Sequence, residues 1–133
     1  MRLTNRSEYA LLALVYLARQ KEGAYVGGAE IAKAQNIPPK FLQQILLILK
    51  RARYIQSFKG QQGGYRLAKP AKDVSIAEIV RLLDGALAPT ESVSRYFYEP
   101  TPLEKEKKLI EMFRHIRDAI AQTMESTSLA DVR

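Results

Sequence analysis

Apolar residues recur at helical spacing along most of the chain. The first such segment, residues 5–20, is apolar on nearly every face, which is typical of a buried helix. Two shorter helices are predicted over 29–34 and 40–53, separated by a turn that ends in Pro38, and Pro39 suits the first turn of the second of them. Two short helices joined by a tight turn predict a helix-turn-helix. The apolar side of the 40–53 helix is expected to comprise Phe41, Leu42, Ile45, Leu46, Leu49 and Ala52.

A β-hairpin is predicted directly after this motif. Residues 54–58 and 65–68 have the character of strands, the loop 59–64 between them contains three glycines, and residues 25–26 are a candidate for a further short strand. A hairpin in this position is typical of the wing of a winged helix. Glycines allow the backbone at its tip to approach a DNA groove closely. A nucleotide-binding loop is excluded, because the GxxxxGK[ST] motif is absent and the loop joins two strands.

The second half of the chain predicts a fourth helix over 76–84, an irregular segment, and a long last helix over 103–124. The last helix carries an apolar stripe of Leu109, Phe113, Ile116, Ile120 and Met124. Such a stripe must be buried, either on its own domain or on the same helix of a second subunit. We favour the second arrangement, since two-fold dimers are the usual way to contact two DNA half-sites.

The predicted fold is therefore mainly α with a small β-hairpin wing: a winged helix-turn-helix plus a long C-terminal dimerisation helix. Residues 1–85 are predicted to form the DNA-binding domain. Residues 86–102 form an irregular sensor or linker segment, and residues 103–133 form the dimerisation helix and tail.

Charge divides the chain into a basic and a balanced part. The net charge is +7, but residues 1–73 carry 13 basic and four acidic side chains, a net charge of +9. Residues 74–133 carry eight basic and ten acidic side chains, a net charge of −2. A basic region joined to a balanced one suggests a polyanionic partner, most commonly nucleic acid. A solvated surface that only aids solubility is the alternative.

Composition excludes several classes of protein. The chain has no cysteine and a single histidine, His115, which excludes disulfides, thiolate zinc sites and multi-histidine metal sites within one chain. No apolar run is long enough to span a bilayer, and the N-terminal residues do not resemble a signal peptide. No nucleophile–base pair or nucleotide loop is present. We therefore expect a cytoplasmic, metal-free protein that is not an enzyme and has no membrane partner.

Short motifs spread over nearly all of the chain point to a known family. The wing contains Gly63-Gly64-Tyr65-Arg66-Leu67, and the chain closes with Leu129-Ala130-Asp131. The other matching segments are Leu3-Thr4, Glu8-Tyr9-Ala10, Ile31-Ala32, Phe41-Leu42-Gln43-Gln44-Ile45-Leu46 with Leu49, Gly60, and Val80 with Leu83-Asp84-Gly85. In this order they resemble the Rrf2-type transcriptional regulators. The resemblance implies a bacterial winged-helix homodimer that binds a palindromic promoter element, usually as a repressor.

One departure from the family concerns its cofactor. Many Rrf2-type regulators carry three cysteines after the fourth helix, where they hold an iron–sulfur cluster. In this chain residues 88–103 contain none, and Ser92 stands about where the first of them would lie. A serine alkoxide is a poor iron ligand at neutral pH, so no cofactor is expected. Ser92 is either the natural residue of this chain or a replacement of a native cysteine.

The winged-helix interpretation also indicates which residues contact DNA. The N-terminal end of the third helix enters the major groove, where Lys40 can donate to guanine and Gln43 or Gln44 can pair with adenine. Lys59 at the wing tip can reach the adjacent minor groove. The expected DNA-binding residues are Arg2, Pro38, Pro39, Lys40, Gln43, Gln44, Arg51, Lys59, Gly60, Gln61 and Arg66. For each of them, a solvated surface position is the alternative.

The favoured function is a sequence-specific regulator of transcription that represses as a homodimer on double-stranded DNA. One alternative is a winged-helix module for protein interaction, whose binding would lack the salt dependence of phosphate contacts. The other is a regulator controlled by a partner enzyme or a small-molecule effector. The exposed-looking aromatic residues Tyr96, Phe97 and Tyr98 would be the docking site, unless they pack beneath the last helix.

Overall fold

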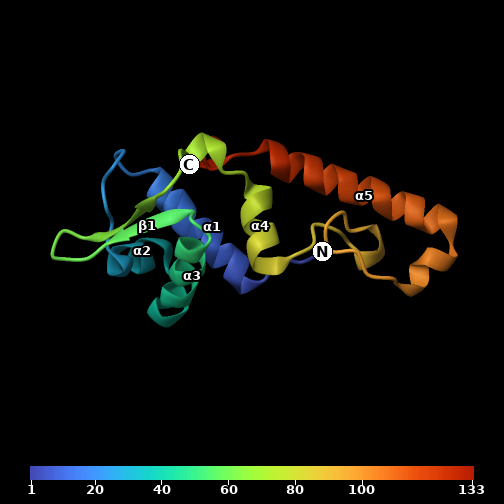
Figure 1. Ribbon diagram of the computed structural model, residues 1–133, viewed down its shortest axis with the longest axis horizontal. Helices are drawn as coiled ribbons and strands as arrows, with labels where there is room; N and C mark the ends of the chain where they lie inside the picture. Colours follow the sequence, from blue (N-terminus) through green and yellow to red (C-terminus); the bar gives the residue numbers. More distant parts are fainter.

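Most of the chain is helical, with one two-stranded antiparallel sheet (Figure 1). The computed structural model describes all 133 residues. In chain order the elements are α1 (Asn5–Ala18), α2 (Gly28–Gln35), α3 (Pro39–Arg51), β1 (Ile55–Phe58), β2 (Gly64–Leu67), the 3-10 turn η1 (Ala71–Asp73), α4 (Ile76–Asp84), the 3-10 turns η2 (Glu91–Val93) and η3 (Pro102–Lys105), α5 (Lys107–Ser126) and α6 (Leu129–Val132).

The predicted helix-turn-helix is present as α2 and α3. The turn begins at Asn36, whose φ of 54° places it in the left-handed region and ends α2. Ile37 then enters the core with 3% exposure, and Pro39 occupies the first turn of α3. Proline suits this position because its missing N–H would have no partner inside the helix. Both helices pack against α1, which is buried along one face.

The α3 helix turns its apolar residues inward, with one exception. Leu42, Ile45, Leu46 and Leu49 are all at most 2% exposed. Phe41 was expected on the same side, but it is 53% exposed. It follows Lys40 on the outer side of the helix, where its ring lies 6.2 Å from that of Tyr9. Its apolar character had suggested burial, whereas the fit of α3 against α1 leaves this position at the surface.

The hairpin forms the wing, and a single residue extends it to a third chain segment. Ile55 pairs with Leu67 at one end of the ladder and Phe58 pairs with Gly64 at the other. The expected strand at 25–26 is reduced to an isolated bridge between Val26 and Tyr65. Val26 donates its N–H to the carbonyl of Tyr65 at 2.8 Å, and Tyr65 donates to Val26 at 2.7 Å. The bridge ties the base of the wing to the segment that leads into α2.

Gly64 is essential to this bridge. Its φ is +146°, and a Cβ there would lie 2.3 Å from the carbonyl oxygen of Val26. We expect Gly64→Ala to reduce the free energy of unfolding by about 2–4 kcal/mol, because the wing must move away from Val26. Urea denaturation followed by circular dichroism measures this loss. Gly27→Ala is the matched control, since its Cβ would meet nothing within 4 Å. Equal stability of the two variants would contradict the role of the close contact.

The C-terminal tail returns to the winged-helix region. The α4 helix begins at Ser75 with a reciprocal capping box to Glu78. The last helix begins later than predicted, at Lys107, since Glu106 has an extended backbone between η3 and α5. After α5 the chain donates a hydrogen bond from Leu129 N–H to the carbonyl of Val74, and the Leu129 side chain is fully buried in the main core. Residues 103–133 thus contribute to the core of the region predicted as residues 1–85, and the predicted domain boundaries stay a prediction.

The α5 helix extends away from this core (Figure 1), and its predicted apolar stripe divides into two parts. Ile120 and Met124 pack against the buried Ala77, Val80 and Leu87 of the same chain. Toward the other end, Leu109, Met112 and Ile116 are 42%, 47% and 40% exposed, and Phe113 is half-buried. These four residues are the outer α5 stripe. They recur at spacings of three and four residues, so they lie on one face of the helix.

Asp84 joins the end of α4 to the start of α1. Its carboxylate accepts hydrogen bonds from the hydroxyl and from the backbone N–H of Thr4, the latter at 3.0 Å. Burial raises the pKa of Asp84, but these hydrogen bonds outweigh burial and hold the pKa below its usual range. A carboxyl group with a lowered pKa in the folded state stabilises the fold above its unfolded pKa of about 3.9 and loses that contribution as the pH falls through the folded value.

We therefore expect Asp84→Asn to be less stable than the wild-type protein at pH 7, with the difference shrinking below about pH 4. Chemical denaturation at a series of pH values measures this convergence. Asp73→Asn is the control, because Asp73 is exposed. A constant difference between Asp84→Asn and the wild type from pH 7 to pH 3 would show that the ionised carboxylate does not carry the stabilisation.

Candidate nucleic-acid interface

The α3 helix presents one polar face to solvent. Lys40, Gln43 and Gln44 are exposed in its first two turns. Their spacing of three and four residues places them on the same side of the helix, opposite the buried leucines. Figure 1 shows α3 projecting from the body of the molecule beside the hairpin. Side chains on a projecting helix of this length can enter a major groove, which admits an α-helix.

Two further residues extend this face. Leu47, 46% exposed, and Arg51, also exposed, follow Gln44 at helical spacing. Arg51 was predicted as a DNA contact, whereas Leu47 was not. The position of Leu47, seven residues after Lys40 and therefore on the same helix face, was the signal that could have identified it. An exposed aliphatic side chain here can contact the methyl group of thymine.

An open groove separates α2 from α3 next to Gln43. Its volume is about 590 Å3, and Lys33 of α2 lines it together with Pro39, Gln43 and Tyr65. Lys33 is exposed and was not singled out from the sequence, because a lone lysine on a short helix is an ordinary surface residue. Pro38 and Pro39 are exposed at the turn. Lys33 therefore adds a cation beside the α3 face.

The wing tip is the second exposed basic element. Lys59, Gly60 and Gln61 are all exposed. Every salt bridge of the structure lies between residues 81 and 125. None of the 13 basic side chains of residues 1–73 is therefore paired in this way. Unpaired cations on a protein surface are available to neutralise phosphates.

The structure places Arg66 away from this face. Successive side chains of a strand point to opposite sides, and Tyr65 faces α2, where its ring lies near Gly28. Arg66 instead donates to the carbonyl of Gly23 at 3.2 Å and to Gln56 at 3.2 Å, and its guanidinium lies 4.5 Å from the centre of the Tyr25 ring. These contacts hold the turn before α2, and the phosphate contact expected of Arg66 stays a prediction.

Arg2 is also separated from the other predicted residues. It is exposed, but the N-terminus lies beside α4 on the side away from the hairpin (Figure 1). The structure thus brings together Pro38, Pro39, Lys40, Gln43, Gln44 and Arg51 on or before α3, and it groups Lys59, Gly60 and Gln61 at the wing tip.

The segment that would hold a cluster contains no set of iron ligands. Ser92 is buried, and its hydroxyl oxygen accepts a hydrogen bond from Thr101 at 2.7 Å. No group of three or more histidine, cysteine, aspartate or glutamate side chains is placed to hold a metal ion. Hydroxyl groups hydrogen-bonded to one another are poor ligands for iron, so these residues do not fit an iron–sulfur cluster. Separately, no helix has the length and apolar character needed to cross a membrane.

Comparisons with known proteins agree with this geometry. The sequence profile of the Rrf2 family, described as an iron-dependent transcriptional regulator, matches residues 3–133. The Mycobacterium tuberculosis protein Rv1287, named as an HTH-type transcriptional regulator, is 37% identical over 135 residues, which cover 99% of this chain and 81% of that protein. The HTH-type transcriptional regulator CymR of Bacillus subtilis is 26% identical over 99% of this chain and 89% of its own length.

Solved structures show the same architecture. The structure of CymR, the global cysteine regulator of B. subtilis, superimposes with a TM-score of 0.80 at 26% identity, over 99% of this chain and 95% of that one. The oxidised form of CymR from Staphylococcus aureus superimposes with a TM-score of 0.76 at 29% identity, over the same shares of the two chains. The predicted winged-helix fold and the predicted family are thereby confirmed. The chain belongs to the Rrf2 family and is a DNA-binding transcriptional regulator.

Proposed function

We propose that the protein binds an inverted-repeat promoter element as a homodimer and represses transcription by occluding the promoter. It acts in the bacterial cytoplasm, through binding alone and without a catalysed reaction. The observation that carries the proposal is the exposed polar face of α3 beside an unpaired basic wing. A dimer doubles this surface and matches the two-fold symmetry of an inverted repeat.

Within this proposal the two exposed elements have different tasks. Lys40, Gln43 and Gln44 contact base edges in the major groove, while Pro38 and Pro39 set the approach of α3. Lys59 enters the adjacent minor groove, and Gly60 and Gln61 allow the wing backbone to follow the phosphates closely. Arg51 contacts a phosphate at the far end of α3. Arg2 and Arg66 are left outside the proposed contact surface.

The outer α5 stripe is the proposed dimer interface. Exposed apolar side chains on one face of a long helix are stabilised when the same face of a second subunit covers them. Of the residues expected at the interface, Leu109, Phe113 and Ile116 belong to this stripe. Met112 joins them by its exposure. Ile120 and Met124 form the inner edge of the proposed interface, where they also contact the core of their own chain.

Selection from a random pool of double-stranded DNA at roughly physiological salt tests the proposal. We expect an inverted repeat to emerge without any added ligand. Its half-sites should lie about one helical turn, or a multiple of it, apart. Binding to the selected sequence should weaken linearly in log K with log salt, by roughly 0.9 for each phosphate neutralised. A single unrepeated half-site would contradict the dimer, and binding that ignores salt would favour a protein-interaction module.

A second candidate keeps the DNA-binding role and adds a partner protein. Tyr96, Phe97 and Tyr98 are 66%, 45% and 56% exposed, and three consecutive exposed aromatic residues are typical of a protein contact. A partner enzyme seated there would control the regulator, in place of a bound cluster. Loss of the partner's effect on operator binding in a Tyr96→Ala variant would support this role.

A further inference from the structure

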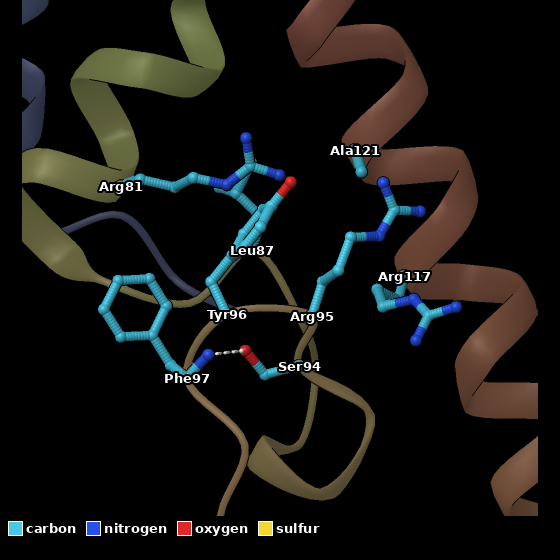
Figure 2. A pocket seen from close by; sticks show the side chains of 8 residues that line it. All are labelled: Arg81, Leu87, Ser94, Arg95, Tyr96, Phe97, Arg117 and Ala121. Carbon is cyan, nitrogen blue, oxygen red and sulfur yellow. Dashed lines mark hydrogen bonds between the residues drawn. The ribbon is translucent and has the colours of Figure 1, made fainter.

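Three arginines from three different segments meet between α4 and α5. Arg81 comes from α4, Arg95 from the irregular segment, and Arg117 from α5, and all three line one small cavity. Figure 2 shows Arg81 and Arg117 on opposite helices, with Arg95 extending from the loop toward α5. The side chains of Arg81 and Arg117 are only 21% and 19% exposed. We call this group the arginine pocket.

Arg81 and Arg95 keep most of their hydrogen-bonding capacity, whereas Arg117 does not. Arg117 donates to Asp118 through Nε and one terminal nitrogen, and to the carbonyl of Val93 at 2.8 Å through the other. Arg81 makes a single hydrogen bond, to Glu125 at 2.6 Å. Arg95 makes a single long one, to Asp118 at 3.4 Å. Because a guanidinium has five N–H donors, Arg81 and Arg95 have several to spare.

Ser94 lies at the floor of the cavity. Ser94 is 8% exposed, and its hydroxyl oxygen accepts the N–H of Phe97 at 2.9 Å (Figure 2). Ser94 thus holds the Phe97 backbone at the floor, and the spare donors that border the cavity are those of the guanidinium groups. All of these recognise a negatively charged oxygen.

Charge and size limit what can enter. Three arginines face two carboxylates, those of Asp118 and Glu125, so the cluster keeps a positive charge. The enclosed volume is about 10 Å3, which holds one water-sized atom group. That space matches the size of one oxygen of a carboxylate or phosphate group. Arg95 and Tyr96 form the outer wall and are exposed, so the remainder of such a ligand would lie in solvent beside them.

We propose that the arginine pocket binds the oxyanion end of a small metabolite, a carboxylate or a phosphate, through Arg81 and Arg95. Arg95 is the arm that turns to the ligand, because its long contact to Asp118 is the easiest to exchange for a ligand oxygen. Arg117 holds the wall in place through Asp118 and Val93. The occupied site connects α4, the irregular segment and α5, which are the parts that link the DNA-binding region to the proposed dimer helix.

Titration of the full-length protein with citrate and, separately, with inorganic phosphate tests the proposal without DNA. Because no DNA is present, a failure of anion binding is distinguishable from a failure of the proposed regulatory function, on which the proposed role of the site rests. Ionic strength is held constant with sodium chloride, and the arginine Nε–Hε resonances are followed by NMR. We expect saturable binding at millimolar anion, with the largest shifts at Arg81 and Arg95. Saturation by phosphate alone would identify a phosphate ligand, and saturation by citrate alone would identify a carboxylate.

Two variants separate this site from the basic DNA-binding surface. Arg95→Gln should weaken anion binding by about tenfold or more, because it removes a charge-assisted donor. Lys59→Gln removes the same charge from the wing tip and should leave the dissociation constant unchanged. Equal weakening by both variants would overturn the proposal, since the anion would then bind diffusely to the basic surface. Absence of saturation, with no shift at Arg81 or Arg95, would overturn it as well.

Discussion

Replacing Ile116 by glutamate is expected to convert the protein from a dimer to a monomer and to weaken operator binding by about 100-fold or more. Ile116 is 40% exposed in the outer α5 stripe, between Met112 and the half-buried Phe113 on one side and the core-packed Ile120 on the other. A carboxylate in an apolar interface must be desolvated, and burying an unpaired charge is strongly unfavourable. The monomer then binds each half-site separately and loses the gain that comes from linking the two sites.

Sedimentation analysis gives the oligomeric state, and fluorescence anisotropy on the selected operator gives the affinity. Gln122→Glu is the matched control, because it introduces the same charge at an exposed position of the same helix. Circular dichroism verifies that both variants fold. If Ile116→Glu remains dimeric at full operator affinity, another surface joins the subunits and the outer α5 stripe has a different partner.

A point substitution is a cleaner test than truncation. Deleting the chain from residue 103 onward would remove the stripe, but it would also remove Leu129, which is fully buried in the core formed with α1. Loss of DNA binding in the truncated protein would then report unfolding as readily as loss of the dimer. Because the C-terminal tail is part of the core, the dimer interface must be tested by a point substitution that leaves the tail in place.

Gln43→Ala is expected to weaken binding to the selected operator by about 5- to 160-fold, which corresponds to the roughly 1–3 kcal/mol of one good base contact. Gln43 is exposed on the α3 face between Lys40 and Leu47. Because glutamine is neutral, the slope of log K against log salt should stay the same, while discrimination at one base pair should be lost. Lys40→Ala should produce a comparable loss and, where it contacts a guanine, a loss of discrimination at a different base pair.

Competition binding with single-base operator variants measures this discrimination. Lys108→Ala is the control, since it removes an exposed positive charge from α5, outside the proposed contact surface. It should alter neither sequence preference nor affinity by more than about twofold, as expected for a distant charge at this ionic strength. Should Gln43→Ala weaken all sequences equally, α3 would contact only the phosphate backbone and the proposed base recognition would be wrong.

Local patterns in the sequence were sufficient for most of the elements, although the strand expected at 25–26 is only an isolated bridge and the last helix begins at Lys107. The proline at the start of α3, the run of glycines in the hairpin and the capping serine of α4 each act within a few residues. Helical periodicity similarly placed Leu42, Ile45, Leu46 and Leu49 on the buried face, as found. Together with the charge asymmetry and the family motifs, these signals predicted the winged helix and its DNA-binding role. The individual contacts to DNA remain predictions.

Contacts between distant segments were decided only by the tertiary structure. The apolar character of Phe41 predicted burial, whereas the residue is exposed. The position of Arg66 in a strand gave no sign that its side chain holds the turn at Gly23. Nothing near Leu129 in the sequence predicted its place in the main core.

The arginine pocket illustrates the same division most clearly. Arg81, Arg95 and Arg117 are separated by 14 and 22 residues along the chain, and no periodicity relates them. They meet because α5 runs back toward α4 and passes beside the irregular segment (Figure 1). Sequence by itself determined most of the helices and both strands of the hairpin, because those preferences arise from neighbouring residues. The packing of those segments decided which side chains share a surface, because that depends on residues far apart in the chain.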